Sequence, residues 1–294
     1  MGELKSLVEF VQKTKFKSLQ MLDLVLEPNT QLRHLYEQLS LGEAEAEDDI
    51  LSATRDVIDE SQLPSLKSKL KDRLLDIVFL LDFKESDYRD RQRAFLMCSK
   101  KWAACMILLH KNMRQVGIAK LEQLLRHTLS FEFTELSLET LRVLRLHYGT
   151  VEGDFKKYRY YEERLLEQER IWLAERQAES LYIELAAQYV NAKAGKDAAF
   201  RKSIEYYKRI EPNLEQFKSF KVHLYGRLIE TLIFECQNDY AGMARVCEEA
   251  IQFYKNKDYK SDLSLQVFYY NLVNCYLHLR QFEKGQNSIY LLEQ

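Results

Sequence analysis

Side chains that could act in catalysis or bind a metal are plentiful in this 294-residue chain, but their spacing matches no common catalytic pattern. None of the six histidines lies three or four residues from another, so no helix would present two imidazoles on one face. The glycine-rich phosphate loops, the HExxH and GxSxG motifs and the Glu-x-x-His pairs of di-iron bundles are also missing from the sequence. We therefore expect a non-catalytic protein with no cofactor and no metal site.

The cysteines favour a structural role for their thiols. There are five, an odd number, and none forms a CxxC pair, which argues against a disulfide framework or a zinc site. Cys98 and Cys105 lie seven residues apart, on one helical face, as small core residues would. A reducing compartment follows, and we expect a cytoplasmic protein. No run of about 18 apolar residues occurs, so we expect no membrane partner.

The composition predicts long helices. Only 3 prolines and 9 glycines occur, and both residues interrupt helices, whereas sheet proteins need them for turns. Hydrophobic residues make up 46% of the chain, enough for a large core, and charged residues of both signs make up 30%. The net charge of -2 gives no support to binding nucleic acid through overall charge. We expect an all-α fold.

Residues 1–90 read as an N-terminal helical region. Apolar residues recur every three or four positions over 4–26, which predicts an amphipathic helix that ends before Pro28. Thr30 can cap a shorter helix that reaches Leu39. After a break at Pro64, another apolar stripe predicts a helix to about Phe83. The pattern changes near residue 90, where we place a domain boundary.

Residues 91–294 show a repeat with a period near 40. A bulky residue recurs near the expected end of the first helix of each pair, at separations of 39, 41, 45 and 42 residues. The residues are Leu109, Tyr148, Tyr189, Phe234 and Tyr276. Such a period is typical of a solenoid, in which each helix pair buries its apolar face against the next. We predict an α-α superhelix of stacked antiparallel helix pairs.

The last unit is the most regular. It reads Tyr269-x2-Leu272-Val273-x2-Tyr276, then Gln281-Phe282, then Gly285-x3-Ile289. This pattern resembles the tetratricopeptide repeat, in which small residues let two helices approach and aromatic residues fill the space towards the neighbouring pair. The units here exceed the usual 34 residues of that family, so a HEAT-like or other helical repeat stays open.

The resemblance implies a peptide-binding groove. In tetratricopeptide arrays the first helix of each pair lines the concave side, where extended peptides or partner helices bind. Stepping around each first helix from its bulky residue gives the positions that would face this groove. They are Arg142, Asn191, Tyr225, Glu235, Tyr270, Asn274 and His278.

Binding of a protein or peptide is therefore the leading functional hypothesis, with the chain as a scaffold or peptide-binding module. One alternative is a regulatory receptor, in which the repeats sense a peptide and the N-terminal helices act on a partner. Another is nucleic-acid binding through the basic stretch 89–101, which we interpret instead as the solvated start of a helix. The apolar helix before Gln294 would pack against the preceding helix pair, pair with a second copy of the protein, or be followed by further residues in the natural protein.

Overall fold

The computed structural model divides the chain into two compact units, Met1–Phe83 and Lys84–Gln294. The residues that the structure describes are 2–13, 25–27, 30–41, 57–79, 90–190 and 196–293. Within these ranges the chain forms twelve α-helices and one short 3-10 helix, with no strand. The expected all-α fold is confirmed.

In the first unit, three α-helices pack around a leucine-rich core. They are α1 (Gly2–Lys13), α3 (Gln31–Ser40) and α5 (Leu63–Phe79), and the 3-10 helix η1 (Glu60–Gln62) leads directly into α5. The expected cap is confirmed, because the Thr30 side chain accepts a hydrogen bond from the backbone N–H of Arg33 at 3.3 Å. The remainder of the helix expected over 4–26 falls mostly outside the described residues.

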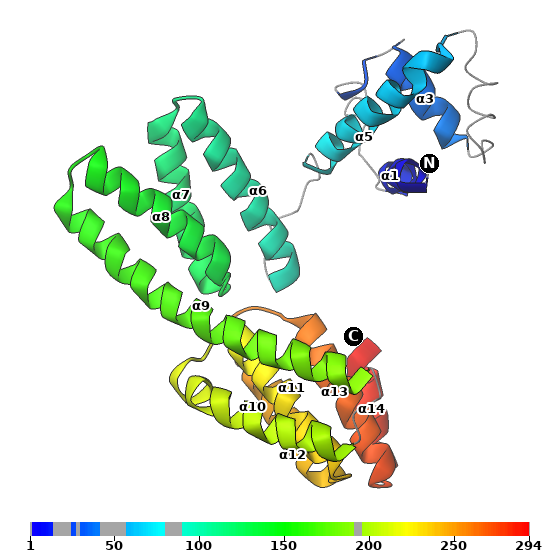
Figure 1. Ribbon diagram of the computed structural model, residues 1–294, viewed down its shortest axis with the longest axis vertical. Coiled ribbons are helices and arrows are strands. Elements are labelled where there is room, and N and C mark those ends of the chain that lie inside the picture. The colour runs from blue at the N-terminus through cyan, green and yellow to red at the C-terminus, as the bar shows by residue number, and fades with distance from the viewer. Residues whose placement is uncertain are drawn as a thin grey trace. The chain divides into compact units, whose positions relative to one another are not determined.

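The second unit is built from helices that each pack against the next one in sequence (Figure 1). They are α6 (Arg91–His110), α7 (Arg114–Ser130), α8 (Thr134–Thr150), α9 (Phe155–Val190), α10 (Lys196–Gln216), α11 (Phe220–Cys236), α12 (Tyr240–Lys255), α13 (Asp262–His278) and α14 (Phe282–Glu293). Contacts between α6 and α8, and between α9 and α11, add a second layer of neighbours. None of the helices in the described part of the chain is both long and apolar enough to cross a bilayer.

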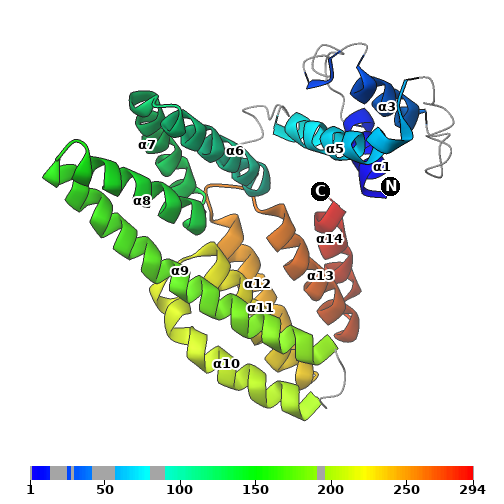
Figure 2. The same ribbon diagram turned by 45° about the horizontal axis from the view of Figure 1, so that its top comes forward.

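Helix α9 departs from the expected division into stacked helix pairs. The repeat predicted that one pair ends and the next begins between residues 155 and 190, but these 36 residues form one continuous helix. The physical reason is plain in the sequence, because no glycine or proline occurs between Phe155 and Val190. At 1.5 Å per residue the helix is about 54 Å long. It packs on α8, α10 and α11 and so joins the two halves of the unit (Figure 2).

Four of the turns between consecutive helices share one geometry. Asn112, Glu132, Asn238 and Arg280 each have φ between 55° and 60°, the left-handed conformation of a Schellman helix end. In each case the next residue donates its N–H to a carbonyl five residues back, as Asp239 does to Phe234 at 2.9 Å. Asparagine adopts this conformation readily, whereas in glutamate and arginine it strains the backbone. The strain at Glu132 is offset by contacts described below.

Four of the five bulky residues that mark the period pack against neighbouring helices in two ways, and the side chain of Tyr189 lies outside the described part of the structure. Tyr148 and Tyr276 are buried, and their hydroxyls donate to Glu122 and Glu248 on the preceding helix at 2.7 and 2.6 Å. Leu109 and Phe234 lie instead against glycines on the following helix. A Cβ added at Gly242 would collide with the ring of Phe234 and would lie 2.6 Å from Asp239 Oδ2.

This close approach gives a matched pair of substitutions. Gly242→Ala should lower the free energy of unfolding by about 1–3 kcal/mol, because the new methyl group overpacks the α11–α12 contact. Gly285→Ala, in the first turn of α14, meets only Tyr276 Cβ at 3.7 Å and should raise it by about 0.5–1 kcal/mol. Urea unfolding of both variants measures the difference, and equal effects would contradict the packing described.

Candidate functional site

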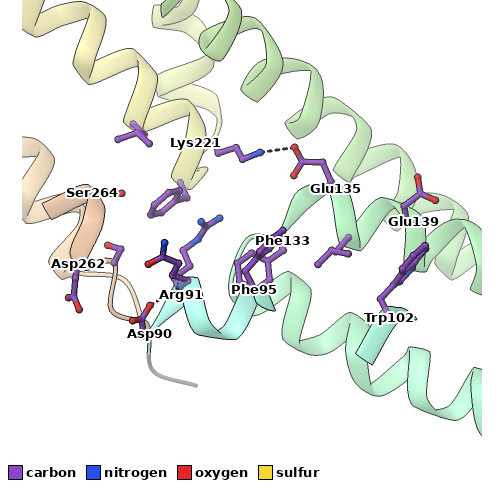
Figure 3. Close-up of a pocket in the computed structure, with 15 residues that line it drawn as sticks. Asp90, Arg91, Phe95, Trp102, Phe133, Glu135, Glu139, Lys221, Asp262 and Ser264 are labelled. Atoms are coloured by element: carbon purple, nitrogen blue, oxygen red, sulfur yellow. Dashed lines mark hydrogen bonds and ion pairs between the residues drawn. The ribbon is translucent and has the colours of Figure 1, made fainter. Parts of the chain in front are cut away.

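A pocket of about 610 Å³ lies where the N-terminal ends of α6, α8, α11 and α13 converge (Figure 3). We call it the central pocket. Its walls are mainly aromatic and aliphatic: Phe95, Trp102, Phe133, Leu136, Phe220 and Leu224. Polar side chains complete it: Asp90, Arg91, Gln92, Glu135, Glu139, Lys221, Ser261, Asp262 and Ser264. Its volume is that of a site for a drug-sized molecule or a short peptide segment.

Arg91 forms one wall of the central pocket and joins the first helix pair to the last. Its Nε and Nη2 donate to the carbonyl oxygens of Phe131 and Glu132 at 3.1 and 3.0 Å. The guanidinium carbon lies 3.7 Å from the centre of the Phe220 ring, a cation–π contact. The backbone N–H of Arg91 donates to Lys260 O at 2.9 Å. One residue at the start of α6 therefore touches the α7–α8 turn, the start of α11 and the loop before α13.

Glu132 makes the complementary set of contacts from the α7–α8 turn. Its Oε1 accepts from Lys257 Nζ at 2.5 Å and from the Tyr259 hydroxyl at 2.9 Å. Its Oε2 accepts from the backbone N–H of Phe220 at 2.6 Å, at the start of α11. Burial and this carboxylate together raise the pKa of Tyr259 well above its usual range, so the phenol stays protonated and donates. These bonds offset the strained backbone of Glu132.

A second carboxyl group, which is buried, connects two of the helices that form the pocket. Glu175, on α9, is 2% exposed, and its Oε1 accepts from the hydroxyls of Thr134 and Ser219 at 2.9 and 2.5 Å. These residues begin α8 and cap α11. Burial raises the pKa of the Glu175 carboxyl, although the two hydroxyl groups oppose the shift. Its Oε2 has no hydrogen-bond partner among the described residues.

Some polar groups at the pocket have hydrogen-bond or ion-pair partners and others do not. Lys221 pairs with Glu135 at 2.6 Å across the gap between α11 and α8. The buried Nε1 of Trp102 and Oγ of Ser261 have no partner within the described part of the chain. In the same part, no group of three or more histidine, cysteine or acidic side chains has the arrangement of a metal site. The arrangement suits reversible binding of an apolar group with polar ends.

The described residues of the predicted groove do not line one common pocket. On α11, Tyr225 is half-buried and donates its hydroxyl to Glu179 at 2.8 Å, and Glu235 is half-buried near the end of the same helix. On α13, Tyr270, Asn274 and His278 follow one face: Tyr270 is 70% exposed, Asn274 is half-buried, and His278 stacks on Tyr240.

The two remaining groove residues lie elsewhere. Arg142, on α8, pairs with Glu139 at 2.8 Å and lines a smaller groove of about 330 Å³ beside Trp172. Asn191 falls outside the described residues. Arg142 thus lies next to the central pocket through its neighbour Glu139.

Within the basic stretch 89–101, of which the structure describes residues 90–101, Arg91 departs from the solvated helix start that we expected. It is half-buried among Phe133, Phe220 and Tyr259, whereas Arg93 and Lys101 are exposed. The partners of Arg91 are 40 to 169 residues away, so helical periodicity alone could not reveal them. The sequence analysis also missed Phe133 and Phe220 as pocket residues, because each lies at a helix start and its contacts are distant in sequence. Their position in or beside the turns between helices was the signal that the sequence offered.

Searches with this sequence against protein-family models, curated proteins and solved structures return no match.

The raised pKa of Glu175 makes stability depend on pH in a defined direction. When the pKa of a carboxyl group is higher in the folded state than in the unfolded state, folding favours its protonated form. The group's contribution to the free energy of unfolding is then greatest below the unfolded-state pKa, and it is lost as pH rises to the folded-state pKa. Glu175→Gln, which mimics the protonated group, should therefore become increasingly more stable than the parent protein as pH rises above about 4.5. The advantage should level off once pH exceeds the folded-state pKa.

Urea unfolding at pH 5 and pH 8 measures this difference. Glu163→Gln, an exposed substitution on the same helix, is the control and should show no such trend. A difference between Glu175→Gln and the parent protein that is constant with pH, or that shrinks as pH rises, would show that Glu175 is ionised in the folded state.

Proposed function

We propose that residues 84–294 form a non-catalytic protein-interaction module, and that an apolar side chain of a partner segment docks in the central pocket. The observation that carries this proposal is the pocket itself, with apolar walls from four helices and a volume of about 610 Å³. Phe95 lines it and is still 45% exposed. Large aromatic side chains left open to solvent in a concave site are typical anchors of binding energy.

The proposal includes a tetratricopeptide-like classification for the helix pairs. Its support is the period near 40 residues, the shared turn geometry and the buried tyrosines that contact the preceding helix. The link between Arg91 and Lys260 adds a feature that an open superhelix does not need, because it joins the first pair to the last. A groove along Tyr270, Asn274 and His278 stays a prediction alongside the central pocket.

Adjacent residues on α6 allow a sharp test. Phe95 and Leu96 are 45% and 48% exposed, but only Phe95 lines the central pocket. Phe95→Ala should weaken binding of the native partner at least tenfold, whereas Leu96→Ala should change it less than about twofold. Affinity capture from the native cell, followed by titration of the captured partner, measures both. Equal loss, or no loss, in the two variants would contradict docking at this pocket.

A regulatory receptor is the second candidate, and the division into two compact units favours it. In this proposal the repeats bind the partner segment and the N-terminal unit acts on another protein. Limited proteolysis should then cut between Glu85 and Arg91, and the partner segment should change the rate of that cut. Resistance of the whole chain to cleavage there would contradict it. Cytoplasmic location belongs to both proposals.

A further inference from the structure

Arg91 brings a positive charge into the central pocket that no acidic side chain pairs with at close range. The residue lines the pocket and is half-buried. Its guanidinium group donates to the backbone carbonyl oxygens of Phe131 and Glu132 and lies over the ring of Phe220. It forms no ion pair with any residue in the described ranges. Because charges that are partly removed from water usually have a partner of opposite charge, this one points to a ligand.

The Arg91 side chain also has donors to spare. Besides the two backbone carbonyls, only the hydroxyl of Tyr259 accepts a hydrogen bond from it within the described residues. Two of the five N–H donors of a guanidinium group therefore remain. Figure 3 shows this side chain pointing from the start of α6 into the pocket, on the same side as Lys221. A carboxylate suits such a group best, because it can accept two parallel hydrogen bonds from it.

The two carboxylates of α8 that line the pocket have other partners. Glu135 pairs with Lys221 at 2.6 Å. Glu139 pairs with Arg142, on the same helix, at 2.8 Å. Neither of these carboxylates forms an ion pair with Arg91.

The carboxylates at the other helix starts do not pair with Arg91 either. Asp90 caps α6, where its Oδ1 accepts from a backbone N–H two residues further on at 2.8 Å. Asp262 is exposed, and Figure 3 shows its carboxylate turned away from Arg91. The Glu132 carboxylate has its own cation, Lys257, at 2.5 Å. The charge of Arg91 is therefore left for an occupant of the pocket.

The helix starts around the pocket add to this charge. The starts of α8 and α13 have no side-chain cap hydrogen bond, and each helix start carries about half a positive charge. Acidic residues in their first turns, Glu135 and Asp262, offset part of it. A helix start makes no site by itself. Next to the unpaired guanidinium group, however, it favours an anion over a cation.

The surface that could hold a partner segment continues beyond the pocket. Glu135 and Glu139 line both the central pocket and the smaller groove of about 330 Å³ beside Trp172. A segment that follows both would pass through the pocket rather than end in it. Its carboxylate would then belong to a side chain and not to the end of the chain.

We propose that the partner segment places an aspartate or glutamate side chain against Arg91, next to the apolar residue that fills the central pocket. This inference rests on the proposed function and names the chemistry of the partner. Because Arg91 is only half-buried, water screens part of the attraction. We therefore expect a preference of about tenfold for the acidic side chain, which corresponds to about 1.4 kcal/mol.

Four short peptides test the proposal. Three are blocked pentapeptides, Ac-Ala-Leu-Phe-X-Ala-NH2, where X is glutamate, glutamine or lysine. They share the apolar residues and differ in the charge at one position. The fourth, Ac-Ala-Leu-Phe-Gly-OH, carries its carboxylate at the end of the chain. Titration calorimetry with the whole 294-residue chain measures the affinity for each peptide.

The glutamate peptide should bind about tenfold more tightly than the glutamine peptide, and more tightly still than the lysine peptide. Arg91→Gln should reduce the preference for glutamate over glutamine to less than about twofold. Arg93→Gln removes the same charge from an exposed position of the same helix that does not line the pocket, so it should keep the full preference.

Folding of the variants is checked separately. Arg91→Gln loses contacts with the α7–α8 turn, so urea unfolding must show that it is folded under the assay conditions. The comparison of the glutamate and glutamine peptides with the parent protein needs no variant. It decides the proposal even where Arg91→Gln does not fold.

The outcomes separate the two proposals. Equal binding of the glutamate and glutamine peptides, weakened by Phe95→Ala, would overturn the acidic side chain and leave the apolar docking site standing. Tighter binding of the lysine peptide, or of the peptide with the free chain end, would also overturn it. So would a preference that Arg93→Gln removes as fully as Arg91→Gln does. Absence of heat from every peptide, up to its solubility, would overturn both proposals.

Discussion

The junction between Arg91 and Glu132 is the contact on which the second unit depends. Arg91 reaches the α7–α8 turn through two carbonyl groups, and Glu132, in that turn, reaches the start of α11 and the loop before α13. Each residue satisfies backbone groups that a helix end would otherwise leave unpaired. Segments separated by 40 to 125 residues are joined in this way. The left-handed backbone of Glu132 is tolerated because its side chain makes three hydrogen bonds.

The central pocket follows from that junction. Bringing the starts of four helices together places their side chains around one space, and the rings of Phe133 and Phe220 pack on Arg91 at its edge. Glu175 also connects α8 and α11 through its hydrogen bonds with Thr134 and Ser219. The pocket walls are therefore held by buried hydrogen bonds as well as by apolar contacts. Such support preorganises a binding site and reduces the entropy lost when a partner binds.

Much of the local structure could be predicted from residue order. The scarcity of glycine and proline predicted an all-α fold, and the Thr30 cap and the buried faces of Cys98 and Cys105 followed from capping chemistry and helical periodicity. The bulky residues Tyr148 and Tyr276 marked real helix contacts. The predicted division into helix pairs was wrong at α9, because residues 155–190 contain no glycine or proline to interrupt the helix. The domain boundary at residue 90, the groove residues and the tetratricopeptide-like class stay predictions.

Helix formation, capping and the small-to-bulky packing of neighbouring helices are local interactions, so residues up to about ten positions apart already specify them. The central pocket is different. Arg91 looked like one charge in a basic stretch, and Phe95 like one exposed apolar residue, until chain folding placed them beside Phe220 and Ser261. Contacts between residues more than a hundred positions apart depend on how the helix pairs stack. For that reason periodicity predicted the helices, and tertiary packing alone created the site.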